Sequence, residues 1–313
     1  MTRSRYIIRR LIQMIPVVIG ITVIIFVMLR AIPGDPADSM LGEKSTNEQR
    51  ALMRKKLGLD EPIYVQYSYF VRDLFTFDLG DSLKYRQPVN DIIWDRLKVS
   101  LTVVGVTAFF LIVITVPLGI LAALKKNSII DNAVRAVLTV TMVMPTFYSG
   151  ILLIIIFSIK LDLLPVSGYG DSPLDHLKHV ILPSLTLALV TAPYLIRILR
   201  ASILDALNSD YVTTARSKGL EERRVISLHV LRNALIPTVT LFGITIGGLM
   251  GGTVITEKVF ALPGAGALLI ESVQFRDYPT VQAATFIFAI MVITINLIVD
   301  IVYSFLDPRV VLS

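Results

Sequence analysis

The sequence has no cysteine, few histidines and little charge for its length. Its 313 residues include no Cys and only three His. A chain without cysteine forms no disulfide, no thiolate metal site and no cysteine nucleophile. None of the histidines stands near a nucleophile and carboxylate that could complete a hydrolase site. We therefore expect no catalytic residue, no metal site and no enzyme activity in this chain.

Charged residues make up only 17% of the sequence, whereas a soluble domain carries about 25%. Hydrophobic residues make up 54%, and the mean hydropathy is +0.71. A soluble fold of this length would need too large a core to bury them, so we expect lipid to be the solvent for much of the surface. The net charge is +6. However, the basic residues lie in the segments between the apolar runs and do not form one basic face, which argues against nucleic-acid binding.

Six runs without Asp, Glu, Lys or Arg are long enough to cross a bilayer as helices, which takes about 20 residues each. The alternating pattern of a β-barrel is absent from the sequence. The sequence therefore predicts an all-α polytopic membrane protein with six transmembrane helices, kinked where Pro117, Pro145 and Pro193 fall inside runs. The runs are residues 11–29, 99–124, 136–159, 180–196, 233–256 and 278–299.

Basic residues between the runs predict the orientation of the chain. Arg3, Arg5, Arg9 and Arg10 precede the first run, and a second basic group surrounds residues 201–234. By the positive-inside rule, both termini are expected in the cytoplasm. No small-residue cleavage site follows the first run, so we interpret this run as an uncleaved signal anchor.

The first loop, residues 31–97, is long and rich in aromatic residues. It predicts a small packed external subdomain, or a cap over the helices. We therefore expect two parts: residues 1–97, the first transmembrane helix with its external loop, and residues 98–306, a core of five helices.

Residues 201–234, between the fourth and fifth runs, predict a helical hairpin that projects from the membrane. Ser209 and Asp210 are suited to begin a helix, and Gly219 stands where that helix would end with a positive φ. Positive and negative side chains are nearly balanced here, which favours docking in a groove of a protein partner over binding to lipid headgroups. A solvated connector is the alternative. The second helix is expected from about residue 220, with an apolar face made by Val225, Leu228 and Leu231.

Several motifs resemble one family. Thr213-Thr214-Ala215, Gly219 and Pro237 are similar to the "EAA" loop of importer-type ABC transporter permeases, with two threonines where that family begins with Glu-Ala. Motifs spread over nearly the whole chain are similar to the B-type permease of dipeptide, oligopeptide and nickel importers. These are Pro33-Gly34-Asp35-Pro36, Leu57-Gly58-Leu59-Asp60-Glu61-Pro62, Asp78-Leu79-Gly80-Asp81-Ser82, Glu257-Lys258-Val259-Phe260, Pro263-Gly264 with Gly266, Arg276-Asp277-Tyr278-Pro279 and Asp307-Pro308-Arg309.

The resemblance implies the type I ABC importer permease fold, spanning the plasma (inner) membrane of a bacterium or archaeon several times. It implies a second homologous permease, two cytoplasmic ATPases that bind ATP and Mg, and an external substrate-binding protein, besides membrane lipid. The chain has no Gly-Lys dipeptide, and so no nucleotide-binding loop of its own; we expect no cofactor in it. The residues that would couple it to an ATPase are Thr213, Thr214, Ala215, Lys218, Gly219, Arg223 and Pro237.

The fifth run carries glycines at spacings that let helix backbones approach closely. They pack helices within the chain or, as the resemblance favours, face the second permease and the translocation pathway. These glycines are Gly243, Gly247, Gly248, Gly251 and Gly252.

Polar residues near or within the runs give further hypotheses. Asp300, one turn from Asn296 on the sixth run, is an intramembrane carboxylate and by default a functional candidate. An ion-coupled secondary transporter using Asp300 is therefore the alternative function, although we favour structural hydrogen bonding. His176 and His179 have a spacing that could bind metal, but they precede an ordinary helix entry and we assign no metal to them.

Together these patterns predict a permease subunit of an ATP-driven importer, for di- or oligopeptides. A nickel or glutathione substrate within the same family, and a non-transporting membrane scaffold, remain alternatives.

Overall fold

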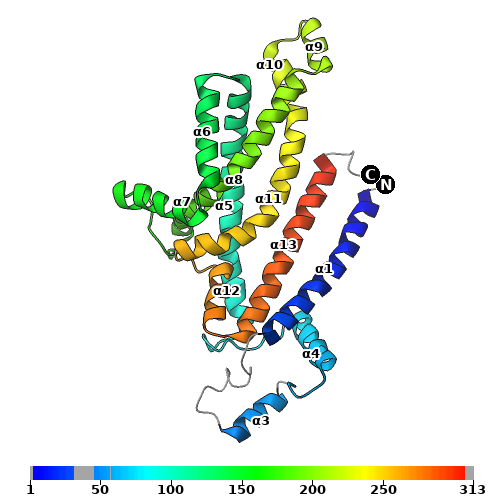
Figure 1. The fold of residues 1–313 in the computed structure, drawn as a ribbon, viewed down its shortest axis with the longest axis vertical. Coiled ribbons are helices and arrows are strands. Elements are labelled where there is room, and N and C mark those ends of the chain that lie inside the picture. The colour runs from blue at the N-terminus through cyan, green and yellow to red at the C-terminus, as the bar shows by residue number, and fades with distance from the viewer. Residues whose placement is uncertain (1–2, 32–45, 57, 307–313) are drawn as a thin grey trace. The chain divides into compact units, whose positions relative to one another are not determined.

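The structure, a computed structural model, describes residues 3–31, 46–56 and 58–306 (Figure 1). Every regular element within these ranges is a helix, as the sequence predicts. The motifs at 33–36 and 307–309, and Leu57, lie outside the described residues. The helices are α1 (Arg3–Ala31), α3 (Asn47–Lys56), α4 (Ile63–Thr76), α5 (Val89–Leu124), α6 (Ile129–Val143), α7 (Thr146–Leu153), η1 (Ile154–Lys160), α8 (Pro173–Leu207), α9 (Asp210–Ser217), α10 (Glu222–Arg224), η2 (Val225–Leu231), α11 (Arg232–Val259), α12 (Ala265–Gln274) and α13 (Tyr278–Leu306).

Five helices of the described residues are long and apolar enough to cross a membrane, and a bent pair adds a sixth crossing if it counts as one span. The five agree with the predicted runs. They are Ile7–Met28 in α1, Val89–Leu124, Pro173–Leu207, Glu222–Val259, which joins α10, η2 and α11, and Tyr278–Ile301 in α13.

The third predicted run, residues 136–159, is not one kinked helix. α6 ends at Val143, and α7 begins after Pro145 with a bend of 113° between the two segments. Between them Met144 is extended, with ψ at 129°. A residue before proline avoids the helical region because its backbone clashes with the proline ring. Pro145 therefore breaks the helix, whereas Pro117 and Pro193 lie inside helices that continue past them.

α5 begins earlier than the second apolar run predicts. Its first residue is Val89, so the loop after α1 ends at Pro88 and residue 97 lies inside the helix. The first turns are charged but still helical, because Asp91 complements the positive helix N-terminus and Asp95 pairs with Lys98 at 2.9 Å. The apolar run in the sequence therefore predicts only the part of α5 that lipid would surround, and not the whole helix.

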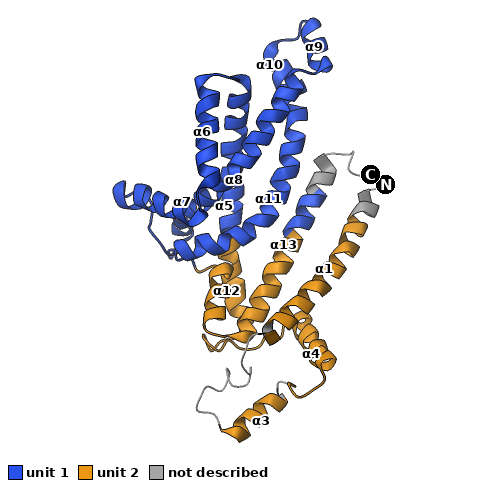
Figure 2. Ribbon diagram, in the orientation of Figure 1, with its two compact units in different colours: residues 1–6, 101–262, 295–313 blue, residues 7–100, 263–294 orange. Residues whose placement is uncertain are grey.

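Unit 1 comprises residues 1–6, 101–262 and 295–313 (Figure 2). Its central helix is α8, which packs against α6, α7 and α11. Residues from Val180 to Ala206 are buried at intervals along α8. α5 approaches α8 closely at Gly119, where a Cβ would lie 2.7 Å from a methyl group of Leu199.

Unit 2 comprises residues 7–100 and 263–294 (Figure 2). In it α4 packs along α1, where the Tyr67 hydroxyl lies 2.8 Å from the Thr22 hydroxyl and its ring meets that of Phe26 edge-on. Other aromatic residues of the predicted subdomain, among them Tyr64 and Phe77, are exposed.

Candidate functional site

The helical hairpin predicted at 201–234 is present at one end of unit 1 (Figure 1). Ser209 is the N-cap residue of α9, but its hydroxyl donates to the Ala206 carbonyl instead of capping the helix. α9 ends at Ser217, and Gly219 follows with φ at +77°. The predicted helix end and the left-handed glycine are therefore confirmed.

Two backbone hydrogen bonds close the turn at Gly219. The Gly219 N–H donates to the Arg216 carbonyl at 2.9 Å, and the Leu220 N–H donates to the Ala215 carbonyl at 3.4 Å. This is the Schellman arrangement, which satisfies the last carbonyls of a helix and needs a left-handed residue. Glycine adopts that conformation without steric penalty because it has no Cβ.

A salt bridge spans the same turn. The Arg216 guanidinium meets the Glu222 carboxylate in a two-bond fork of 2.6 and 3.1 Å. Hydrogen bonding to Glu222 raises the pKa of Arg216 above its ordinary value. The pair therefore keeps both charges at physiological pH and presents them at the exposed tip.

An apolar cluster anchors the root of the hairpin. It joins α9 and η2 to the ends of α5 and α8, and interiors this close-packed transmit displacement instead of absorbing it. A force on α9 would therefore move the end of α8 with it. The buried members are Ala123, Leu199, Ile203, Ala206, Val212, Ala215, Val225, Val230 and Ala234.

The predicted coupling residues divide between the tip and the root. Ala215 is buried in the apolar cluster, and Pro237 lies inside α11 with its ring exposed. The remaining members are exposed on the hairpin: Thr213, Thr214, Lys218, Gly219 and Arg223.

The apolar face predicted for the second helix of the hairpin, with Val225, Leu228 and Leu231, is wrong in its spacing. Val225 is fully buried as expected, but Leu228 is 50% exposed, and Val230 takes the next buried position. Residues 225–231 form the π-helix η2, whose hydrogen bonds skip one residue more than those of an α-helix. The buried positions are consequently five apart instead of three.

A buried ion pair lies beside the hairpin root. Asp131 on α6 is fully buried and accepts two hydrogen bonds from Arg200 on α8, at 2.8 and 2.7 Å. The Asn127 N–H donates to the same carboxylate at 2.9 Å. Sequence analysis did not single out this pair. The only local signal was Ser128 three residues before Asp131, a helix-start pattern that the structure contains.

The glycines of α11 point to different surroundings. A Cβ at Gly243 or Gly247 would overlap Val299 or Asn296 of α13, and one at Gly252 would lie 3.0 Å from Leu187 of α8. Nothing lies within 4 Å of the Cβ positions of Gly248 and Gly251. Three glycines thus serve helix packing within unit 1, and two leave an open strip on the helix.

The other polar candidates lie apart from the hairpin. On α13, Asp300 is partly buried, and Asn296 is exposed while its amide oxygen abuts Gly247. His176 stacks on Tyr169 with ring centroids 4.1 Å apart, and His179 is hydrogen-bonded to the Asp175 carbonyl.

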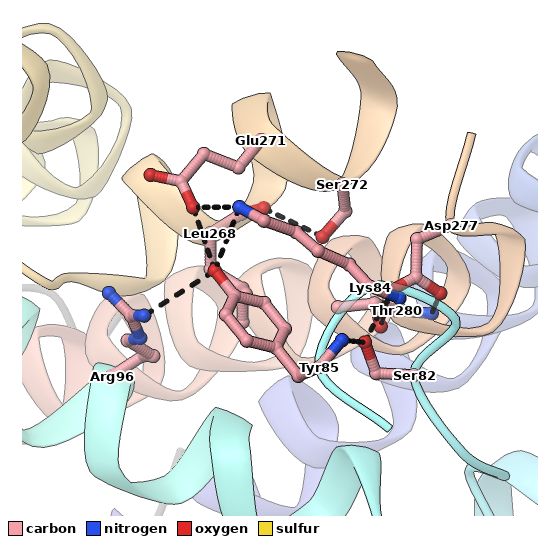
Figure 3. A network of polar contacts seen from close by, with 9 residues as sticks. All are labelled: Ser82, Lys84, Tyr85, Arg96, Leu268, Glu271, Ser272, Asp277 and Thr280. Atoms are coloured by element: carbon pink, nitrogen blue, oxygen red, sulfur yellow. Dashed lines mark hydrogen bonds and ion pairs between the residues drawn. The ribbon is translucent and has the colours of Figure 1, made fainter. Parts of the chain in front are cut away.

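Unit 2 contains a polar network that joins two of the sequence motifs (Figure 3). Asp277 is fully buried and accepts hydrogen bonds from the Ser82 hydroxyl and from the backbone of Leu83 and Lys84. The Thr280 hydroxyl donates to it at 2.8 Å. Asp277 thus fixes the loop before α5 to the start of α13.

Near Asp277, Glu271 binds two side chains of the same loop (Figure 3). Its carboxylate accepts from the Lys84 ammonium and from the Tyr85 hydroxyl, each at 2.7 Å. Burial alone would lower the pKa of Lys84, but the bonds to Glu271 and Tyr85 outweigh it and raise that pKa. Sequence analysis quoted the motifs around Ser82 and Asp277 without connecting them.

Two family descriptions match the chain almost end to end. Residues 115–312 match the binding-protein-dependent transport system inner membrane component, and residues 3–104 match the N-terminal part of the membrane component of such systems.

Three named relatives are similar to this chain over nearly their whole length. The oligopeptide transport system permease protein AppB of Bacillus subtilis is 38% identical, covering 98% of this chain and 99% of the relative. The dipeptide transport system permease protein DppB of Escherichia coli K12 is 36% identical over 98% of both chains. The glutathione transport system permease protein GsiC of Escherichia coli O6:H1 is 38% identical, covering 97% of this chain and 98% of the relative.

Solved structures share the fold. The inward-facing MetNI methionine ABC transporter matches with a TM-score of 0.57 and 19% identity, over 70% of this chain and 98% of that one. An amino acid ABC transporter matches with a TM-score of 0.50 and 17% identity, over 70% of this chain and 94% of that one. The predicted type I importer permease fold is therefore confirmed, and this multi-pass membrane protein belongs to the family of inner membrane components of binding-protein-dependent transport systems.

Proposed function

We propose that this chain is a permease subunit of an ATP-driven importer of di- or oligopeptides. It forms the translocation pathway with a second, homologous permease. Two cytoplasmic ATPases bind ATP and Mg and supply the energy, and an external binding protein delivers the substrate. The chain has a transport role and no enzyme activity of its own.

The observation that carries this proposal is the hairpin. Its tip is exposed, mixed in charge and closed by a rigid glycine turn, and its root is packed into α5 and α8. Such a helix is suited to a groove on a protein partner. Because the root is close-packed, a movement of an ATPase would be transmitted to α8 and from there to the pathway.

The side of the membrane follows from the same proposal. The hairpin and the loop between α5 and α6 lie at one end of unit 1, joined by Ala123 and Val212 of the apolar cluster. We place this end, and both termini, in the cytoplasm. Residues 1–97 then supply the first crossing and an external loop, and residues 98–306 supply the core.

The open strip on α11 supports a second permease as partner. Gly248 and Gly251 are exposed and have nothing within 4 Å of their Cβ positions. Small residues let a neighbouring helix approach closely in a membrane, where packing replaces the hydrophobic effect. We assign this strip to the contact with the second permease or to the pathway wall beside it.

A peptide substrate is supported by the names of the relatives. AppB, DppB and GsiC are named for oligopeptide, dipeptide and glutathione transport. All three substrates are peptides with free carboxylates.

The test is reconstitution of the chain with its presumed partner subunits in proteoliposomes. Uptake of a labelled tripeptide is measured together with ATP hydrolysis, and each subunit is omitted in turn. We expect uptake that requires ATP, all subunits and the binding protein. Uptake by this chain alone, driven by an ion gradient, would show a secondary transporter instead, and Asp300→Asn would then abolish it.

A further inference from the structure

Arg197 on α8 is a charged side chain within a membrane-spanning helix. α8 crosses as Pro173–Leu207, and no Asp, Glu, Lys or Arg occurs between Lys178 and Arg197. The Arg197 side chain is exposed in unit 1. Its contact among the described residues is with the thioether of Met142, 3.3 Å from its guanidinium, and no carboxylate of those residues forms an ion pair with it. An ionisable residue at such a place is a candidate for function.

The direction of the side chain separates Arg197 from Arg200. The two lie less than one turn apart on α8 and share a face. Arg200 binds Asp131 at the start of α6, whereas Arg197 reaches Met142 near the end of α6. These two contact points are about 16 Å apart along α6, at the usual helical rise per residue. Arg197 therefore extends away from the hairpin end of unit 1, toward the break at Pro145.

This direction argues against two ordinary roles for an exposed arginine. A snorkelling arginine would extend toward the nearer membrane surface, which is at the hairpin end, and Arg197 extends the opposite way. Arg197 directly follows the apolar run 180–196 and its side chain extends back along that run. A charge that faced hydrocarbon there would be unfavourable, and intramembrane charges face water-filled cavities or other protein. The exposed face of Arg197 thus borders an aqueous space or a partner subunit.

Its neighbours fit an aqueous space that a solute passes. Tyr194, about one turn away on the same face of α8, is 52% exposed and offers a hydroxyl and an aromatic ring. Ala201, about one turn away on the other side, is exposed and small. The broken helix at Met144 and Pro145 lies on the side to which Arg197 extends. In secondary transporters, broken helices typically form substrate sites near the midplane.

We propose that Arg197 lines the translocation pathway and binds the carboxylate of the passing substrate. A guanidinium forms a planar, two-bond pair with a carboxylate and stays charged at every physiological pH. A peptide with a free C-terminus supplies that group. This inference rests on the proposed peptide importer, and it gives the pathway itself a preference for substrates that carry a carboxylate.

Water access tests the location of Arg197. The chain has no cysteine, so Arg197→Cys provides its only thiol once the partner subunits are also cysteine-free. We expect a water-soluble methanethiosulfonate reagent to label Arg197→Cys in the assembled complex, and a transported tripeptide to slow this labelling. Ile112→Cys, an exposed apolar position on α5, is the control and should react slowly. Lack of labelling at residue 197 would overturn the proposal.

Charge selectivity tests the role. ATP-driven uptake of a tripeptide is compared with uptake of its C-terminal amide, with the binding protein saturated in both cases. We expect Arg197→Gln to lower the ratio of free-acid to amide uptake about tenfold, the size typical of a lost charged hydrogen bond, and Arg197→Lys to preserve most of the ratio.

Other outcomes are also decisive. An unchanged ratio in Arg197→Gln, or loss of the second permease from the purified complex, would overturn the proposal in favour of a gating role or an ion pair with the partner. A wild-type complex that imports no peptide would instead refute the proposed function, while the labelling experiment still reports whether residue 197 borders water.

Discussion

At the scale of single residues, Asp131 shows how a buried charge depends on its partner. Its carboxylate is fully buried and is neutralised by the two-bond contact with Arg200, which is itself largely buried. Removing one member of a buried ion pair leaves the other charge desolvated and unpaired, which is more harmful than replacing both. The pair links α6 to α8 next to the hairpin, so its loss would loosen the segment that we propose moves as a unit.

Asp131→Ala is therefore expected to destabilise the folded protein by about 3 kcal/mol. The double variant Asp131→Leu with Arg200→Met should recover most of this loss, because it buries no charge. Thermal unfolding of the purified chain in detergent measures both, and the single variants Asp131→Leu and Arg200→Met complete a double-mutant cycle with the double variant. Equal unfolding temperatures for wild type and Asp131→Ala would contradict the assigned role of the pair.

Asp277 carries the corresponding role in unit 2, as the shared acceptor for the loop before α5. Asp277→Asn replaces one acceptor oxygen by a donor that faces the hydroxyls of Ser82 and Thr280. We expect faster amide hydrogen exchange at Lys84, whose N–H binds the same oxygen as those hydroxyls and loses its acceptor, but little change at Leu83, whose N–H binds the other oxygen. The expected loss of stability is about 2 kcal/mol. Thr280→Val is the matched control, since it removes one donor and leaves both backbone bonds. Unchanged exchange in Asp277→Asn would refute the tethering of this loop.

At the scale of elements, the turn of the hairpin can be disrupted without touching its exposed side chains. Gly219→Pro forces φ to about −65° where the chain needs +77°, and it removes the N–H that binds the Arg216 carbonyl. If the hairpin couples to an ATPase, this variant should hydrolyse ATP without proportional uptake. Gly219→Asn is the control, because asparagine tolerates the left-handed conformation. Normal coupling in Gly219→Pro would exclude the hairpin as the coupling element.

Neighbouring glycines on α11 separate packing within the chain from packing against a partner. Gly247→Leu would collide with Asn296 on α13 and should lower stability by about 2 kcal/mol through overpacking. Gly248→Leu meets open space in unit 1 and should leave the isolated chain as stable as before. In the assembled complex, by contrast, Gly248→Leu should have the larger effect, because its side chain would displace the second permease. Unfolding in detergent measures the stability of the chain, and co-purification of the second permease measures assembly. If Gly248→Leu assembles fully, this strip is not part of the interface.

How far the sequence predicts each element depends on whether its signals are local. The end of α9 was predictable because Gly219 adopts the left-handed conformation that closes the turn locally, whereas Ser209 marks the start of α9 without capping it through its hydroxyl. The break at Pro145 was predicted only as a kink, since the angle depends on how α7 packs against α8. The π-helix η2 was missed because its hydrogen-bond register is set by burying Val225 and Val230 together. The pair of Asp131 and Arg200 is 69 residues apart in sequence, and no local pattern reports such a contact.

At the scale of the whole molecule, the distribution of charge predicts an orientation that can be read with single thiols. α8 crosses the membrane, so the loop before it and the hairpin after it lie on opposite sides. The basic residues gather at the hairpin end, where Lys126 and Lys218 are exposed, so we expect that end in the cytoplasm. Because the chain has no cysteine, one introduced thiol at a time reports its own side.

In intact cells, a membrane-impermeant maleimide should label Asp171→Cys, in the loop before α8, but not Lys126→Cys or Lys218→Cys. After permeabilisation all three should react, since all three side chains are exposed. The opposite pattern would place the hairpin outside the cell, where no ATPase could reach it, and would refute ATP-driven coupling through this hairpin. Labelling of all three in intact cells would mean that α8 does not cross the membrane. The expected pattern is thus the one arrangement in which positive-inside charge, a crossing α8 and a cytoplasmic hairpin hold together.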